Sequence, residues 1–256
     1  MTVHDIYVWL DEKAPFDTQL EYDNSGLLVG SPRQEITGIL FALDATEAVI
    51  AEALSLGANL LITHHPLMFS ARRRLTDEDC EGRILRRLVR ENISLIASHT
   101  CLDRAPGGIN DALATACGLG EIQGEGFVRA GLFPAPMTAG KAADYLSEAL
   151  HTVVRLMGSP DQQVSCLGLC SGAGGDEWQS ARDLGADAFL SGEIKHHLAL
   201  EMADAGIPAF ECGHFATELP GIFALADALQ SHLNQLEYKV GIFKSAVKAY
   251  QALPLP

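Results

Sequence analysis

Basic residues are scarce in this 256-residue chain, which has 18 Lys and Arg against 33 Asp and Glu and a formal net charge of −15. A protein that binds nucleic acid through a broad face needs clustered positive charge to neutralise phosphates, so the composition argues against that class. The one basic run is Arg72-Arg73-Arg74, a few residues after His65. It could place positive charge near a site entrance or form a solvated loop.

Long apolar runs are absent as well. No stretch reaches the roughly 18 apolar residues that a membrane helix requires. The first residues, MTVHDIYVWLDEKAPF, carry acidic side chains where a signal peptide has a basic stretch followed by an apolar one. We therefore expect a cytoplasmic protein, and its 48% apolar content is ample for a buried core.

The cysteines include no CxxC pair of the kind that zinc ribbons use. A chain of this size needs no disulfides, so reduced thiols are expected. Cys101 and Cys212 lie near histidine motifs, but packing is their expected role because a cysteine thiol behaves as a small hydrophobe. The full set is Cys80, Cys101, Cys117, Cys166, Cys170 and Cys212.

An internal duplication organises the chain. Residues 36–63, ITGILFALDATEAVIAEALSLGANLLIT, align without a gap with residues 164–191, VSCLGLCSGAGGDEWQSARDLGADAFLS. Each copy predicts a strand, a helix and a strand, and a glycine, Gly57 or Gly185, suits the left-handed position that ends the helix. Each copy continues with a helical stretch (about 79–91 or about 195–205) and another strand (93–98 or 207–212).

This alternation predicts an α/β fold of two related lobes with largely parallel strands. Lobe one is expected over about residues 1–125, possibly joined by the C-terminal segment 236–256, and lobe two over about 126–235. Residues 126–133 would open lobe two as a strand, and 138–150 would form its first helix. With no linker between the lobes, residues 1–256 are expected to form a single unit.

Six of the nine histidines follow predicted strand ends, where α/β proteins place their ligand sites. The six are His64, His65, His99, His196, His197 and His214. Both lobes also place a carboxylate four residues after a histidine: Asp103 follows His99, and Glu218 follows His214.

Imidazole and carboxylate ligands of this kind suit a pair of divalent cations, which carboxylates can bridge. Since Pro66 restricts His65 to an extended conformation, the two adjacent imidazoles of His64 and His65 could reach different ions. His4, His151 and His232 lie outside the pattern and are expected to be ordinary packed or surface residues.

Two further segments have alternative interpretations. Residues 106–110, PGGIN, enter a predicted helix whose backbone N–H groups could hold an anion, or they form a simple tight turn. Residues 23–26, DNSG, predict a turn, and their chemistry alone indicates no functional role.

The motifs resemble those of a known family. THHPLMF, SHTCLDRAPGGINDAL, SGEIKHHLAL and ECGHFATE look like the four signature segments of the NIF-three-like proteins, a dinuclear-metal family often described as GTP cyclohydrolase type 2 homologues, and DNSGLLVG matches its N-terminal motif. The resemblance runs from about residue 20 to about 225 and corresponds to the short form, which lacks an inserted domain. Cys101 departs from the pattern, because a residue such as proline is common there.

The resemblance implies two divalent metal ions per subunit, of Zn, Fe, Mn, Ni or Co. The implied ligands are His64, His65, Asp103, His214 and Glu218. It also implies a toroidal homohexamer built as a trimer of dimers. His99 and His196 are then expected to contact substrate or to act as general acid or base.

Two functions follow as alternatives. A metal-dependent hydrolase would direct water at a cyclic amide, a nucleotide or a phosphoester, as the cyclohydrolase description suggests. A non-catalytic metal-binding scaffold or regulator would act through protein partners instead. Because the same ligands serve many reactions, the motifs leave the substrate and the native metal open.

Overall fold

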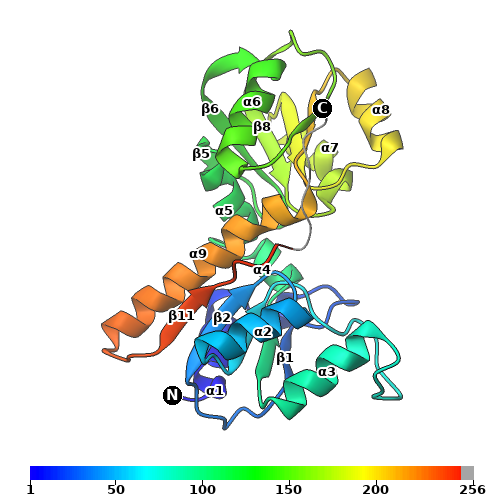
Figure 1. The fold of residues 1–256 in the computed structure, drawn as a ribbon. Helices are drawn as coiled ribbons and strands as arrows, with labels where there is room; N and C mark the ends of the chain where they lie inside the picture. Colours follow the sequence, from blue (N-terminus) through cyan, green and yellow to red (C-terminus); the bar gives the residue numbers. More distant parts are fainter. Residues whose placement is uncertain (249–256) are drawn as a thin grey trace. The chain divides into compact units, whose positions relative to one another are not determined.

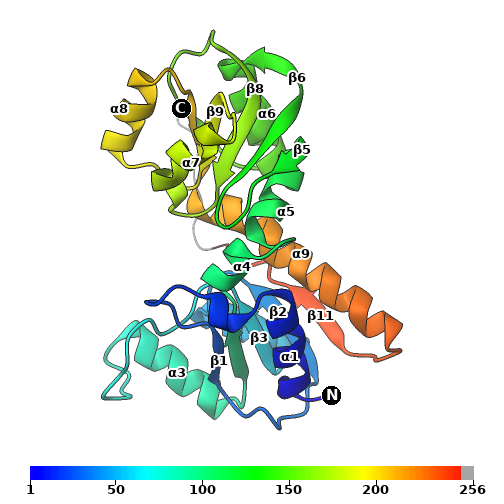
Figure 2. The ribbon, with the colours of Figure 1, turned by 180° about the vertical axis from the view of Figure 1, so that it is seen from behind.

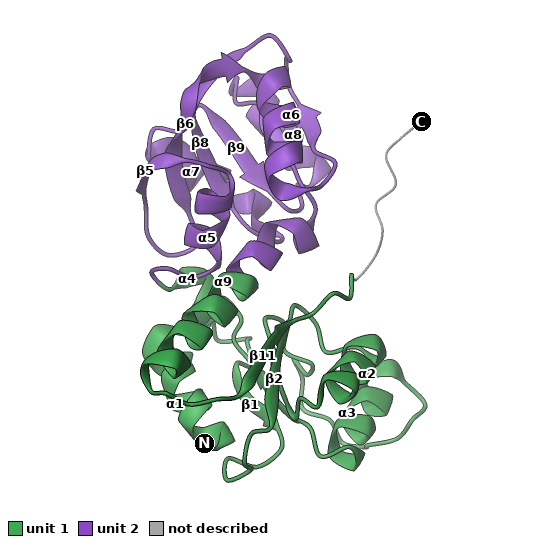
Figure 3. Ribbon diagram, turned by 60° about the vertical axis from the view of Figure 1, so that its left-hand side comes forward, with its two compact units in different colours: residues 1–105, 222–249 green, residues 106–221, 250–256 purple. Residues whose placement is uncertain are grey.

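The computed structural model describes residues 1–248, and these form two compact units, which Figure 3 distinguishes by colour. Unit 1 comprises residues 1–105 and the described residues from 222 onward, and unit 2 comprises residues 106–221. The segment 106–125, expected in lobe one, thus belongs to unit 2. The described part of the C-terminal segment belongs to unit 1, and residues 249–256 lie outside the described residues.

Unit 1 contains a five-stranded sheet in the order β1-β4-β3-β2-β11. Strands β2, β3, β4 and β11 run parallel, and β1 pairs antiparallel with β4. The elements of unit 1 are α1 (Val3–Lys13), the 3-10 turn η1 (Phe16–Thr18), β1 (Gly26–Val29), β2 (Gly38–Ala42), α2 (Glu47–Leu56), β3 (Leu60–Thr63), α3 (Cys80–Arg90), β4 (Ser94–Ala97), α4 (Thr100–Arg104) and β11 (Gly241–Lys244).

Helices cover both faces of this sheet: α2 and α3 lie on one side and α1 on the other (Figure 3). The core beneath α2 and α3 joins Ile50 and Leu88 to strand residues such as Leu61. Helix α2 begins at a Thr46 side chain that caps the N–H of Val49, and it ends at Gly57, whose φ of +68° is the left-handed conformation expected there.

Unit 2 contains a six-stranded sheet in the order β5-β6-β8-β9-β10-β7. Strands β8, β9 and β10 run parallel, while β5, β6 and β7 pair antiparallel with their neighbours. Its elements are α5 (Ile109–Ala116), β5 (Gly120–Gln123), β6 (Arg129–Thr138), α6 (Ala139–Leu150), β7 (Arg155–Met157), β8 (Gln163–Cys170), the 3-10 turn η2 (Gly174–Glu177), α7 (Trp178–Asp183), β9 (Ala188–Ser191), α8 (His196–Asp204) and β10 (Ala209–Glu211).

The strands of unit 2 bury both faces, since successive side chains of a strand point to opposite sides. Leu167 and Leu169 of β8 pack in a core with α5 and α6, whereas Cys166 and Cys170 pack with α7 and α8. Figures 1 and 2, drawn from opposite sides, show α6 and α7 on these two faces. The described cysteines form no disulfide, and all except Cys80 are buried.

The sequence repeat is a structural repeat with the same strand register. In the β2–β3 pair, Ile39 lies opposite Leu60; in the β8–β9 pair, Leu167 lies opposite Ala188. Both partners are shifted by 128 positions. The third parallel strand, β4 or β10, then carries an antiparallel edge strand, β1 or β7. The predicted duplicated α/β fold is therefore confirmed.

Helix α9 (His214–Gln235) was not expected from the sequence. Its first residues belong to unit 2 and those from Ile222 onward belong to unit 1. Pro220 lies inside it and cannot donate the usual backbone hydrogen bond. Within the described residues, none of the helices is both long and apolar enough to cross a membrane.

Candidate metal centre

Three histidines of unit 1 gather at the ends of two neighbouring strands. His64 and His65 follow β3, and His99 follows β4, which runs parallel to β3. One ring nitrogen from each lies within 4.8 Å of the others. The imidazole of His64 is wholly buried, and the ring centroids of His64 and His99 lie 5.1 Å apart. Parallel register thus assembles a three-histidine cluster, as expected for strand ends.

Asp103 brings a carboxylate to this cluster. It lies on α4, a short helix that begins directly after His99. One oxygen, Oδ1, is 3.4 Å from Nε2 of His64, and the side chain is largely buried. The predicted ligands of the first repeat, His64, His65 and Asp103, are therefore neighbours, and His99 lies beside them.

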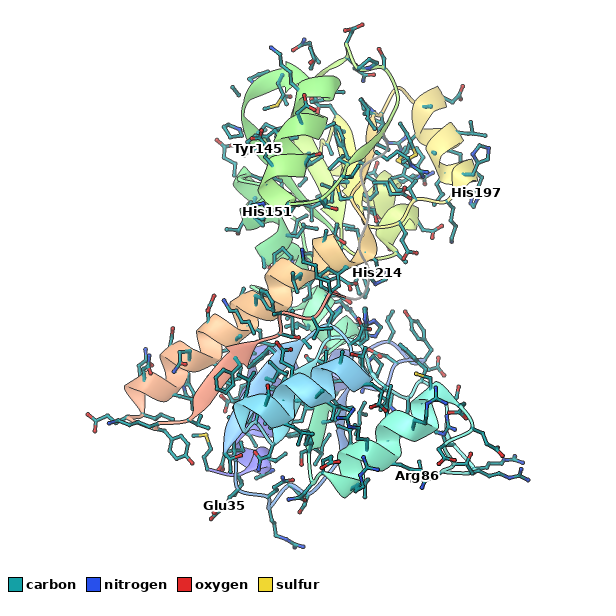
Figure 4. All side chains as sticks on the ribbon, viewed as in Figure 1. Glu35, Arg86, Tyr145, His151, His197 and His214 are labelled. Atoms are coloured by element: carbon teal, nitrogen blue, oxygen red, sulfur yellow. The ribbon has the colours of Figure 1, made fainter. Side chains whose placement is uncertain are left out.

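In unit 2 the histidine and the carboxylate lie on one helix. His214 is the first residue of α9, and Glu218 follows one turn later on the same face, with its Oε1 3.0 Å from Nε2 of His214. Figure 4 shows His214 where α9 begins. Glu218 is almost fully buried, with 5% of its side chain exposed.

Gly172 allows this pair to lie close to the end of β8. A Cβ at position 172 would lie 2.3 Å from Oε1 of Glu218, nearer than real Cβ contacts come, and the φ of +58° also favours glycine. The amide N–H of Gly172 donates to Oγ1 of Thr217, which fixes the loop against α9.

Each of the four imidazoles is held through Nδ1 by an oxygen. His65 contacts Asp44 at 2.9 Å, His99 contacts Asp23 at 2.9 Å, and His214 contacts Glu193 at 2.8 Å. His64 contacts the backbone carbonyl of Ser98 at 2.9 Å. A carbonyl or carboxylate oxygen only accepts, so Nδ1 must be the nitrogen that carries the hydrogen. Outer partners of this kind orient histidine ligands in metal sites.

Asp23 was missed in the sequence, where DNSG indicated only a turn. Its buried carboxylate accepts from the His99 ring and from the backbone N–H of Thr100 at 3.0 Å. Burial would raise the pKa of Asp23, but the hydrogen bonds from His99 and Thr100 outweigh it and lower the pKa well below its usual range. The match of DNSGLLVG to a family motif was the available signal.

This anchoring has an electrostatic consequence within each unit. When Nδ1 carries the hydrogen of a neutral ring, Nε2 presents a lone pair. In unit 1 that atom of His64 faces a carboxylate oxygen of Asp103, and in unit 2 that of His214 faces Glu218. Two lone pairs at such distances repel unless a cation, either a proton or a metal ion, lies between them. The donor set therefore fits a divalent metal.

The repeat explains why the units differ. At the shift of 128 positions, Asp44 corresponds to Gly172 and His65 to Glu193. The strand-end histidine is thus replaced by a carboxylate, and the aspartate by the glycine that makes room for Glu218. Unit 1 is consequently rich in imidazole, whereas unit 2 offers one imidazole among carboxylates.

His99 and His214 share the four-residue spacing to a carboxylate, but they are not equivalent positions, because the strand register differs by one residue. The amide of Ser98 donates to the carbonyl of Thr63, and the amide of Cys212 donates to that of Ser191, so Ser98 and Cys212 are the matching positions. His214 then corresponds to Thr100. Equal spacing to the following carboxylate suggested an alignment that the strand register contradicts.

Other predicted groups lie elsewhere. His196 and His197 are exposed at the start of α8, and neither belongs to a potential metal-binding group among the described residues. Figure 4 shows His197 well away from His214. Arg72 forms ion pairs with Asp79 and Glu81, at 2.6 and 2.7 Å.

The PGGIN segment provides its own anion. The N–H of Gly107 donates to the Asp111 carboxylate at 2.7 Å. That carboxylate also accepts from the Arg129 guanidinium, at 2.6 and 3.0 Å. The simple-turn interpretation therefore describes the start of α5 better than an external anion site does.

Comparison with known proteins identifies the family. Residues 1–250 match Duf34/NIF3 (NGG1p interacting factor 3). A Clostridium perfringens protein named GTP cyclohydrolase 1 type 2 homolog is 30% identical over 244 residues, 91% of this chain and 93% of its own length. A Staphylococcus aureus crystal structure has a TM-score of 0.94 at 27% identity and 99% coverage of both chains. Reduced HcgD from Methanocaldococcus jannaschii has a TM-score of 0.82 at 28% identity, covering 96% and 98%. The chain therefore belongs to the Duf34/NIF3 family.

Proposed function

We propose that the protein is a metal-dependent hydrolase that binds two divalent cations. His64, His65 and Asp103 would be the ligands from unit 1, and His214 and Glu218 those from unit 2. The observation that carries the proposal is the pair of contacts, one in each unit, in which a histidine Nε2 faces a carboxylate oxygen while Nδ1 is held by another oxygen.

Bound metals would lower the pKa of a water molecule toward neutrality and stabilise negative charge on the group under attack. His99 is proposed as the group that accepts or returns the proton, through Nε2. Asp23 would hold the ring in position through Nδ1. We favour His99 over His196 for this role, since His99 lies beside His64 and His65.

The name of the relatives, GTP cyclohydrolase 1 type 2 homolog, supports attack of water on a carbon of a ring. The proposed substrates are cyclic amides, nucleotides or phosphoesters. Zn, Fe, Mn, Ni and Co all suit imidazole and carboxylate ligands, and cellular supply selects among them. A homohexamer is proposed on the family resemblance.

The proposal is tested by metal loading. Protein stripped with a chelator is reloaded with each metal, analysed for metal content, and assayed on the three substrate classes. We expect two equivalents per chain and a turnover that Asp103→Ala abolishes. Glu218→Gln should lose at least one equivalent, because the amide is a poorer ligand than the carboxylate, while exposed Glu12→Gln serves as the control. Retention of both metals in Glu218→Gln would remove Glu218 from the ligands.

A scaffold or regulatory role is the second candidate, favoured by the family description, NGG1p interacting factor 3, which names a protein interaction. Under this alternative the metals bind with the same stoichiometry, yet no metal supports turnover that depends on Asp103. Co²⁺ spectra discriminate further, since a closed site keeps its spectrum when small anions are added and an open site changes it.

A further inference from the structure

Positive charge is concentrated in one short part of this acidic chain. Seven of its 18 Lys and Arg residues lie within residues 72–90, and all seven are arginine. Four of them belong to α3, at positions 83, 86, 87 and 90. This spacing places them along one side of the helix, while Ile84, Leu85 and Leu88 are buried on the other.

The four arginines line a cavity of about 290 Å³ in unit 1 together with Glu47 and Asp77. Arg86 lies on the solvent side of α3 (Figure 4). Four guanidinium groups face two carboxylates, so the lining carries an excess of two positive charges. None of the six residues belongs to the three-histidine cluster or anchors one of its rings.

The carboxylates of the lining hold the arginines in position. Arg86 pairs with Asp77 at 3.0 Å, and Arg83 donates to the Asp77 carbonyl at 3.2 Å. Arg87 donates to the Glu47 carbonyl at 3.1 Å and also contacts its carboxylate. Guanidinium groups fixed in advance lose less side-chain entropy when a ligand binds.

The helix dipole accounts for only part of the cluster. Cations are favoured in the last turn of a helix, which applies to Arg87 and Arg90. Arg83 and Arg86 precede that turn, and no local propensity requires arginine there. Their convergence on one cavity with an excess of positive charge suits an anionic ligand.

We propose that this cavity binds a small phosphorylated anion through a di- or triphosphate group. The planar guanidinium forms paired hydrogen bonds with phosphate oxygens, and arginine is the usual residue for this recognition. A cavity of this size admits a small ligand. Nucleic acid is disfavoured because it requires an extended basic track, and the chain as a whole is strongly acidic.

The test is titration calorimetry of chelator-treated full-length protein with inorganic tripolyphosphate at low ionic strength. Removal of metals prevents the probe from binding through a cation at the histidines. We expect saturable binding of one tripolyphosphate per chain. The double variant R83Q/R90Q should weaken it about tenfold or more, since two charge-assisted contacts are lost.

The matched control is R33Q/R182Q, which removes the same charge from two exposed arginines elsewhere and should bind as the wild type does. The variant R83K/R90K keeps both charges but lacks the guanidinium forks, so it should also bind more weakly; it serves where R83Q/R90Q fails to fold by circular dichroism. Absence of binding to the wild type, or equal weakening in the control, overturns the proposal. Tighter binding of a single-stranded oligonucleotide, lost in R83Q/R90Q, overturns it in favour of nucleic acid.

Discussion

Three carboxylates determine which ring nitrogen their histidines present as a candidate metal ligand. They are Asp23, Asp44 and Glu193. Each is separated from its histidine by 21 or more positions along the chain. Local sequence pattern carries no information about such pairs, and only the family motif DNSGLLVG pointed to one of the three, Asp23. The histidines themselves could be predicted, because strand ends are recognisable from apolar runs.

Removal of one anchor tests this orientation. In Asp44→Ala the ring of His65 loses the acceptor of its Nδ1 hydrogen, so we expect affinity for one metal to fall by about 10- to 100-fold. Stability should change little, since 41% of the Asp44 side chain is exposed. Competition with a chromogenic chelator measures the affinity.

Asp183→Ala is the control for that experiment, because 74% of this carboxylate side chain is exposed and it pairs with its neighbour Arg182. An unchanged metal affinity in Asp44→Ala would show that Asp44 does not orient a ligand. The result would then leave His65 fixed by packing alone.

Gly172 is the second test at the scale of single residues. Gly172→Ala forces a Cβ against Glu218 and a left-handed φ on alanine, so we expect lower stability together with lost metal binding. Gly57→Ala imposes a similar strain, with a φ of +68°. Apart from its chain neighbours, however, the added Cβ would have no atom within 4 Å. This substitution should cost about 1 kcal/mol and retain metal.

Thermal unfolding and metal analysis of both variants separate the two effects. If Gly172→Ala binds metal as well as Gly57→Ala does, the close approach of Gly172 to Glu218 is not required. Sequence alone could not identify this glycine, because the requirement for glycine at position 172 comes from the side chain of Glu218, 46 positions away.

At the scale of elements, Arg129 joins β6 to α5. Its side chain is 4% exposed, and it pairs with Asp111 at 2.6 Å and donates to the carbonyls of Gly126 and Val128. Burial would raise the pKa of Asp111, but the hydrogen bonds from Arg129 and Gly107 outweigh it and lower the pKa below its ordinary value of 3.8.

We expect Asp111→Asn to destabilise the protein by about 2 kcal/mol, because it leaves a buried guanidinium without its carboxylate. Since the folded pKa is the lower one, the pair stabilises the fold above about pH 4 and the benefit is lost as the pH falls through the folded pKa. Urea unfolding at pH 7 and near pH 3 measures both the destabilisation by Asp111→Asn and its dependence on pH. If the free energies of unfolding of wild type and variant differ by the same amount at both pH values, the charge of Asp111 does not stabilise the fold.

The sequence predicts the central elements because they are repeated. Apolar runs and the glycines after the helices identify β2, α2 and β3 and their counterparts 128 positions later. Edge strands β5, β7 and β11 contain no buried residue, so they lack the apolar run that identifies the central strands. Helix α9 contains Pro220 and Gly221, residue types that normally indicate a break.

At the scale of the whole molecule, the sequence does not indicate the bounds of the compact units. One reason is that α9 contributes residues to both units. The expected lobes met at residue 125, whereas unit 2 begins at residue 106. The strand at 120–123 pairs with β6, and this pairing explains the earlier boundary. Duplicated patterns indicate which elements are equivalent but not where a flanking strand attaches.

Metal removal tests the molecule as a whole. A cation that binds only the folded chain stabilises it by about 2.7 kcal/mol when the metal is about 100-fold above its dissociation constant. For a chain of this length that corresponds to a rise of about 5–10 °C in the midpoint of thermal unfolding. We expect calorimetric scans of reloaded protein to show this rise over chelator-treated protein.

Two variants test which residues hold the stabilising metal. Asp103→Ala should abolish the rise, whereas Asp183→Ala should retain it. A rise that survives in Asp103→Ala would mean that the stabilising metal binds elsewhere, and the ligands of the proposed dinuclear site would have to be reassigned.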